Sequence, residues 1–185
     1  MKREEKSEIV RYFAFLRGIN VGGTKVIRME ELQRLFEGAG LKEVKTFIQS
    51  GNVRFRAAEK DPERLTRKIT EYLKQQLGYE VQLMLRTEEE MEALVGSDPF
   101  KGRKEDADTK LYVSFLAALP EHKMKLPLIV EKEGIEVISQ KGREACIISR
   151  RVAGRYGFPN LLIEKELKVP ATTRNWNTVL KMHYK

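Results

Sequence analysis

The chain has 185 residues, of which 41% are hydrophobic and 34% are charged, a composition typical of a globular protein that needs no disulfide. Its single cysteine, Cys146, has apolar neighbours that favour a small buried side chain over a reactive thiol. Residues 1–8 are of mixed charge, and no apolar run approaches the ~20 residues that a membrane span requires. We therefore expect a cytoplasmic protein with no membrane partner.

The net charge of +8 is concentrated toward the C-terminus. Residues 1–100 carry 18 basic and 17 acidic side chains, whereas residues 101–185 carry 17 and 10. Within residues 139–185 the counts are 10 and 3. This concentration predicts a basic surface that attracts phosphate groups or nucleic acid, although such a surface also serves solubility alone. The candidate nucleic-acid contacts are Lys141, Arg143, Arg150, Arg151 and Arg155.

The first half of the chain shows the apolar patterns of a β-α-β-β-α-β unit. The expected elements, in chain order, are a strand at 9–16, a helix at 29–39, strands at 44–48 and 53–55, a helix from 61 to 77, and a strand at 81–85. Asp61 and Pro62 are typical of a helix N-cap and first turn. A short helix is expected after Thr87, whose side chain suits a cap.

The second half repeats this pattern, and Tyr12, Phe15 and Leu16 recur at an offset of 100 as Tyr112, Phe115 and Leu116. The expected elements are a strand at 111–116, a weak helix at 121–131, strands at 135–138 and 145–149, a helix at 159–167, a short strand at 171–173 and a helix at 176–184. We predict an α+β fold: a tandem of two ferredoxin-like (βαββαβ) subdomains with antiparallel sheets, plus a C-terminal helix. The subdomains span residues 1–98 and 109–185, with a charged connector between them.

Topology places two polar loops of the first subdomain together. The loop after the first strand and the hairpin between the second and third strands lie at the same end of such a sheet. The candidate ligand-binding residues there are Arg17, Asn20, Gly22, Gly23, Lys25, Gln49, Ser50 and Asn52. Glycines let backbone N–H groups approach a ligand, and the helix N-terminus that follows favours anions. Alternatively, Gly22 and Gly23 make a turn, and the two asparagines hydrogen-bond the local backbone.

A second polar cluster lies at residues 172–178, next to the only tryptophan. Thr173 or Asn175 is expected to cap the last helix while Trp176 packs against the core. Capping accounts for one of these residues, and Arg174, Asn175 and Asn177 are therefore kept as candidate ligand contacts.

Three segments resemble the signature sequences of the domain-of-unknown-function 1697 family: LRGINVGG at 16–23, IQSGNV at 48–53 and LKVPATTRNWNT at 167–178. The resemblance spans nearly the whole chain. It implies two ferredoxin-like subdomains and no established enzymatic activity. Residues 154–158 read GRYGF where the family tends to have a Gly-Arg-Ser-Lys-Leu-like segment, so no role for that Ser-Lys pair carries over.

The sequence contains no catalytic or metal-binding motif that we recognise. His122, His183 and Cys146 fit no zinc spacing, and no nucleophile elbow is present, so we expect no metal and no cofactor. RNA-recognition modules share the βαββαβ order, but they carry aromatic side chains on the third strand. The corresponding strand at 145–149 has none.

These observations favour a binding protein for a phosphate-bearing partner, either nucleic acid or a nucleotide-like small molecule. One alternative is an enzyme that acts on a phosphorylated small molecule at the same loops. Another is an interaction protein whose open sheet faces bury one another or a second copy. The sequence does not distinguish a monomer from a homodimer.

Overall fold

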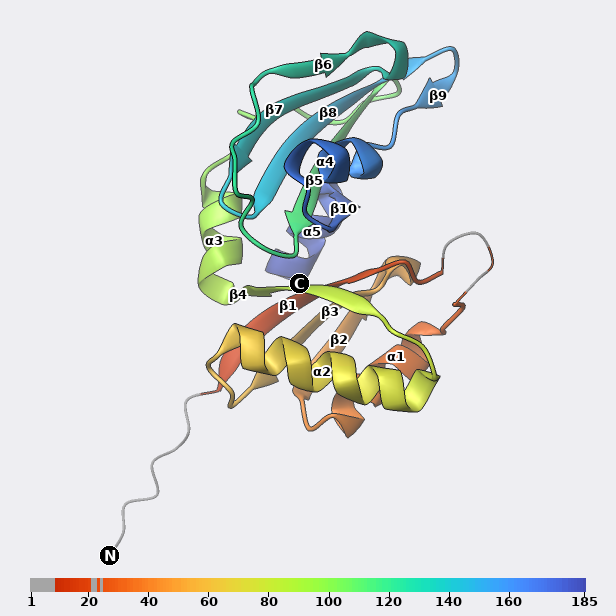
Figure 1. The fold of residues 1–185 in the computed structure, drawn as a ribbon, viewed down its shortest axis with the longest axis vertical. Helices are drawn as coiled ribbons and strands as arrows, with labels where there is room; N and C mark the ends of the chain where they lie inside the picture. Colours follow the sequence, from red (N-terminus) through yellow and green to blue (C-terminus); the bar gives the residue numbers. More distant parts are fainter. Residues whose placement is uncertain (1–8, 21–22, 24) are drawn as a thin grey trace, which may run out of the picture. The chain divides into compact units, whose positions relative to one another are not determined.

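The computed structural model describes residues 9–20, 23 and 25–185 (Figure 1). The chain divides into two compact units, Met1–Met91 and Glu92–Lys185. Within the described residues the fold is α+β, with one antiparallel sheet in each unit and five α-helices. No helix of the described residues is long and apolar enough to cross a membrane.

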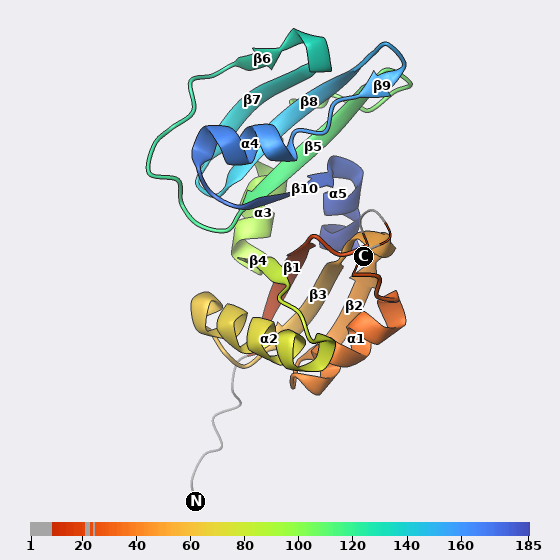
Figure 2. The same cartoon turned by 45° about the vertical axis from the view of Figure 1, so that its right-hand side comes forward.

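The first unit follows the element order expected from the sequence. Its elements are β1 (Val10–Arg17), α1 (Met29–Gly38), β2 (Lys42–Phe47), a 3-10 turn (Ile48–Ser50), β3 (Asn52–Ala57), α2 (Pro62–Leu77) and β4 (Gln82–Thr87). The sheet order is β2-β3-β1-β4, and α1 and α2 lie on the same face (Figure 2). Alternate residues of β1 face these helices, and Tyr12, Ala14 and Leu16 pack there with Phe36 and Ile69.

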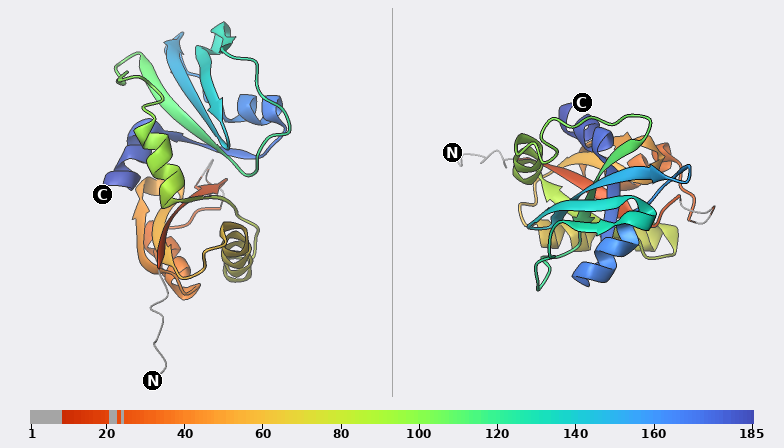
Figure 3. Two further views of the ribbon diagram at one scale, coloured as in Figure 1. Left: turned by 90° about the vertical axis from the view of Figure 1, so that its left-hand side faces the viewer. Right: turned by 90° about the horizontal axis from the view of Figure 1, so that it is seen from above.

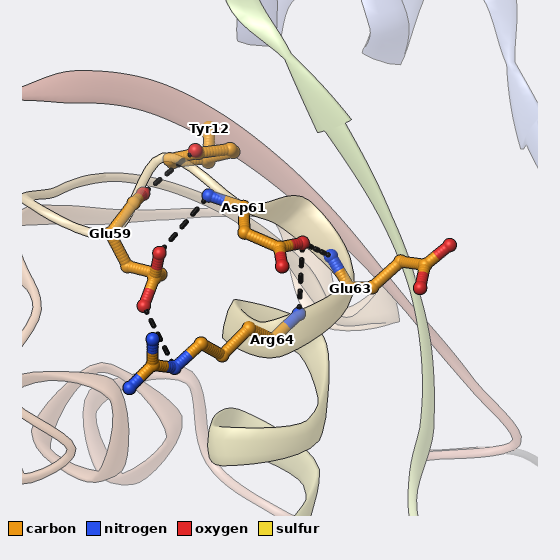
Figure 4. Close-up of polar contacts among 5 residues, drawn as sticks. All are labelled: Tyr12, Glu59, Asp61, Glu63 and Arg64. Atoms are coloured by element: carbon orange, nitrogen blue, oxygen red, sulfur yellow. Dashed lines mark hydrogen bonds and ion pairs between the residues drawn. The ribbon is translucent and has the colours of Figure 1, made fainter.

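The start of α2 shows how local sequence sets an element boundary (Figure 4). The Asp61 side chain accepts hydrogen bonds from the backbone N–H groups of Glu63 (2.9 Å) and Arg64 (3.2 Å), which confirms the predicted N-cap. The Glu59 carboxylate accepts from Asp61 N (3.1 Å) and pairs with Arg64 (3.3 Å). Tyr12 Oη donates to Glu59 O (2.8 Å), so the cap is also fixed to β1.

The second unit holds a larger sheet with the order β10-β5-β8-β7-β6. After α3 (Glu88–Gly96), which runs across the division between the units, its elements are β5 (Thr109–Leu116), β6 (Leu128–Val130), a 3-10 turn (Glu131–Glu133), β7 (Ile135–Lys141), β8 (Glu144–Val152), β9 (Arg155–Tyr156), α4 (Asn160–Leu167), β10 (Ala171–Asn175) and α5 (Trp176–Tyr184). Figure 3 shows α4 and α5 on opposite sides of this sheet. The core beneath α4 contains Leu116, Val137, Ile147 and Ile163.

The helix expected at 121–131 is absent, and this prediction was wrong. Pro127 has no N–H to donate within a helix and disfavours the helical conformation at Leu126. The apolar residues that follow instead form the edge strand β6, which pairs antiparallel with β7 through Leu128↔Val137. The second unit therefore departs from the βαββαβ order between its first two long strands.

The offset of 100 residues nevertheless has a structural counterpart. Leu16 N donates to Gly51 O, and Leu116 N donates to Arg143 O, each over 2.8 Å. Each repeated strand therefore ends against the turn of the hairpin that follows it in the chain.

Candidate functional site

Asn20 joins the two polar loops of the first unit. Its side-chain amide donates to Ile27 O and Gln49 O, each over 3.0 Å, and its side-chain oxygen accepts from Ile27 N over 2.8 Å. Its backbone has φ 55°, in the left-handed region. The loop after β1 and the β2–β3 turn are therefore held together as the topology predicts, by a side chain that was expected to bind a ligand.

The β2–β3 turn is built around a buried asparagine and a glycine. Asn52 is fully buried and donates to Phe47 O and Ser50 Oγ, each over 3.0 Å. A Cβ at Gly51, which has φ 70°, would lie 2.6 Å from Ile19 Cδ1. The turn is thus a tightly packed piece of the fold, and the Asn52 side chain does not reach solvent.

A hollow of about 470 Å³ opens beside this junction, and we call it the α1 hollow. Its lining residues come from the loop, the turn and the first turn of α1: Asn20, Gly23, Val26, Ile27, Arg28, Met29, Glu30 and Gln49. Arg28 occupies the N-cap position of α1, and no side chain of the described residues caps this helix. The first N–H groups of a helix have no intrahelical acceptor, and within the described residues no side-chain cap takes their place at α1.

Two candidate cations of the first unit, Arg17 and Lys25, are not part of this lining. Arg17 donates to Gln82 Oε1 over 3.0 Å. Lys25 Nζ lies 5.1 Å from the ring centroid of Tyr79 and donates to Glu80 O over 3.3 Å. Both cations are thus directed toward the segment that leads into β4. Gly22, also expected in the site, lies outside the described residues.

The C-terminal candidates are integrated into the second unit. Asn175 caps α5 by accepting from Asn177 N (3.0 Å), which confirms one of the two expected caps. The side-chain amides of both asparagines donate to the Glu105 carboxylate, Asn177 over 2.6 Å, and that carboxylate also accepts from Leu111 N over 2.8 Å. We call Glu105, Leu111, Asn175 and Asn177 the Glu105 junction. Sequence analysis did not identify it, because Glu105 lies in a charged stretch that resembles a connector.

Arg174 is buried, with 8% of its surface exposed. It donates to Thr172 Oγ1 (2.7 Å) and Thr173 O (2.9 Å). Burial lowers the pKa of Arg174 to about 10, because charge is disfavoured away from water. The local environment of Arg174 is thus that of an interior side chain.

The five candidate nucleic-acid residues fall into two groups. Lys141 and Arg143 lie at the β7–β8 turn, whereas Arg150, Arg151 and Arg155 lie at the far end of β8 and on β9. At ~3.3 Å per residue the two groups are roughly 20 Å apart. At the far end the structure adds aromatic neighbours, Tyr156 and Phe158, that the sequence analysis did not select. These two aromatic residues flank Gly157 directly after Arg155, and this pattern was the available signal in the sequence.

Titratable groups give little support for catalysis in the described residues. Burial raises the pKa of the Cys146 thiol to about 11, so it is protonated at neutral pH, in agreement with the expected buried cysteine. No three His, Cys, Asp or Glu side chains among these residues converge on a metal position.

Comparisons with known proteins agree with the fold described above. The family model described as "Protein of unknown function (DUF1697)" matches residues 9–145. The structure is similar to that of the conserved bacterial protein SP0830 from Streptococcus pneumoniae, with a TM-score of 0.64 and 22% sequence identity. The match covers 95% of this chain and 98% of that chain, and at this identity it shows the fold alone. No curated protein matches the chain.

Proposed function

The chain belongs to the DUF1697 family of proteins of unknown function, and we propose that it binds a phosphate-bearing small molecule in the α1 hollow. The observation that carries this proposal is the start of α1. The helix begins at the wall of the hollow without a side-chain cap. Uncapped N–H groups and the positive end of the helix dipole favour an anion at this position.

The lining supplies the remaining contacts that such a ligand needs. Arg28 is exposed beside the helix start and adds a full positive charge, and the Gln49 amide offers both a donor and an acceptor. The volume lies in the range of small-molecule sites, about 300–1,000 Å³. A nucleotide-like small molecule therefore fits the hollow better than a polymer strand does.

Glu30 restricts the class of ligand further. Glu30 is one of the lining residues, and its negative charge weakens the attraction for a bare anion. A carboxylate accepts hydrogen bonds from hydroxyl groups, so a ligand with sugar hydroxyls beside its phosphate would use both features. Phosphorylated sugars and nucleotides combine these groups, whereas inorganic phosphate has only one of them.

The experiment is a thermal-shift and calorimetric titration with inorganic phosphate, ribose 5-phosphate and nucleoside monophosphates. Arg28→Gln removes the charge and keeps much of the side-chain length. We expect the binding of a phosphorylated compound to weaken by about tenfold or more, as for one charge-assisted hydrogen bond. Arg34→Gln is the matched control, because Arg34 is exposed on the same helix away from the lining.

Two outcomes would reject the proposal. One is the absence of stabilisation by any of these compounds at millimolar concentration. The other is an equal loss in Arg28→Gln and Arg34→Gln, which would show a diffuse charge effect. The enzyme alternative is read from the same samples, because turnover of a bound compound changes its phosphorus NMR spectrum with time.

A further inference from the structure

A short hairpin in the second unit brings cations and aromatic rings close together. β9 pairs antiparallel with the end of β8, with Arg151 opposite Tyr156 and Val152 opposite Arg155 (Figure 2). Ala153 and Gly154 both have positive φ, 48° and 77°, as in the two-residue turns that suit the twist of a hairpin. The hairpin thus has a defined turn and a defined register.

The ring of Tyr156 is held between two cations. The Arg151 guanidinium lies 5.2 Å from the ring centroid, and Lys110 Nζ lies 5.8 Å from it. Tyr156 Oη donates to Ala107 O, which anchors the far end of the side chain. The two cations are therefore positioned by a ring that is itself fixed to the backbone.

Phe158 is presented on a similarly rigid backbone. A Cβ at the preceding Gly157 would lie 2.4 Å from Glu133 O, and Gly157 O accepts from Ser149 Oγ over 2.8 Å. The Phe158 ring meets Tyr112 edge to face at a centroid distance of 6.0 Å and an interplanar angle of 85°. It is nevertheless 59% exposed, so one part of the ring is open to solvent.

Charge and ring chemistry together indicate the occupant. We call Lys110, Arg151, Tyr156 and Phe158 the hairpin surface. Asp108 Oδ1 lies 3.8 Å from Arg151 Nε. The pKa of Asp106 is lowered by a hydrogen bond from Asp108 N and in part by the charge of Lys110, so two carboxylates offset part of the positive charge. Arg155, on the other face of the hairpin opposite Val152, leaves the hairpin with an excess of positive charge. Exposed aromatic rings stack on unpaired bases, while nearby cations contact the phosphates of the same strand. Bases in a duplex are already stacked and are not available to a ring.

We propose that the hairpin surface binds single-stranded nucleic acid, with a base stacked on Phe158 and phosphates at Lys110 and Arg151. This goes beyond the small-molecule function proposed for the α1 hollow and does not depend on it. It also replaces the wider basic footprint expected from the sequence, because Lys141 and Arg143 lie at the opposite end of β8.

The test measures fluorescence anisotropy of a labelled 20-nucleotide single strand and of the matching duplex at several salt concentrations. We expect the single strand to bind more tightly than the duplex. Phe158→Leu, which keeps an apolar side chain but removes the ring, should weaken the binding about tenfold. Arg151→Gln should weaken it severalfold and make the salt slope shallower by about 0.7.

Three control variants make the result specific. Lys123→Gln removes an exposed charge elsewhere in the second unit and should leave the affinity within about twofold. Leu161→Ser removes an apolar side chain that is 77% exposed at the start of α4, and it should also have little effect. Arg28→Gln should leave strand binding intact, so failure at the α1 hollow is distinguished from failure here.

The proposal is overturned if the single strand does not bind at low salt, or if the duplex binds as tightly. Equal losses in Phe158→Leu and Leu161→Ser would show that the effect does not depend on the aromatic ring, and would also overturn it. Phe158 and Arg151 are exposed, so both variants should fold, and circular dichroism checks this. Should Phe158→Leu misfold, the affinity and salt slope of Arg151→Gln still decide the question.

Discussion

Asn20 makes three side-chain hydrogen bonds from a left-handed backbone conformation. Asparagine tolerates this conformation better than most residues, because its short polar side chain can bond the local backbone. The side-chain amide of Asn52 likewise bonds the backbone, because it donates to Phe47 O within the turn. The sequence could identify these residues as polar loop positions. It could not tell a ligand contact from a backbone contact, since both use the same amide groups.

We expect Asn20→Ala to destabilise the first unit by about 2–4 kcal/mol, from lost hydrogen bonds and backbone strain together. Asn20→Gly removes the same hydrogen bonds but accepts φ 55° without strain. It should be less destabilising by about 1 kcal/mol. Urea denaturation measures both variants. Equal stabilities would show that the left-handed conformation of Asn20 carries no cost.

Arg28 stands at an N-cap position where Ser, Thr, Asp or Asn are the stabilising residues. Arg28→Ser should therefore raise the stability of the protein by about 1 kcal/mol through a new cap. The hydroxyl of the introduced serine would accept a hydrogen bond from an N–H group that the proposed ligand needs, so ligand binding should weaken. Thermal denaturation with and without a phosphorylated compound measures both effects. A variant that is no more stable than the wild type would show that the helix start is already satisfied.

At the scale of elements, the sequence predicted helices and strands best where neighbouring residues alone determine the conformation. The bounds of α5 agree with the predicted helix at 176–184, because Asn175 caps it and Trp176 begins its apolar face. The helix predicted at 121–131 failed because the apolar residues 128–130 suit an edge strand as well as a helix. Which of the two forms depends on pairing with β7, and that is a tertiary contact that local periodicity does not contain.

The Glu105 junction shows how an irregular segment is held by one carboxylate. Glu105→Gln keeps the size of the side chain but places an amide against the two asparagine amides and Leu111 N. We expect this change to destabilise the second unit by about 1–3 kcal/mol, since donors are left unpaired. Glu121→Gln, at an exposed position, is the control and should change stability by less than about 0.5 kcal/mol.

At the scale of the whole molecule, the excess positive charge of residues 139–185 is spread over several surfaces. Arg174 takes one of these charges into the interior, and Arg150 pairs with Glu136 over 2.7 Å. A count of charges therefore predicts a basic surface that is broader than the hairpin surface we propose. Only the three-dimensional arrangement separates cations beside exposed rings from cations used in pairing.

The rate at which a thiol reagent labels Cys146 measures how often the folded chain opens. The raised pKa of this cysteine, about 11, and its burial should leave it unreactive toward a thiol reagent at pH 8, by roughly 100-fold or more relative to the unfolded chain. Because the folded pKa is raised, the thiol favours folding below the unfolded pKa of about 9. That contribution is lost as the pH rises toward 11. Labelling at pH 8 that is as fast in the native protein as in urea would contradict this.

The uncapped start of α1 also allows a bound anion to be detected by hydrogen exchange. Amide protons without an acceptor exchange rapidly with solvent, whereas those inside a helix are protected. Within the described residues, the N–H groups of Met29, Glu30 and Glu31 have no helical acceptor, while Leu32 N donates to Arg28 O over 2.9 Å. An anion bound at the helix start would slow the exchange of those first protons and leave the rest of α1 unchanged. Hydrogen exchange could therefore screen mixtures of metabolites for the ligand before its chemical identity is known.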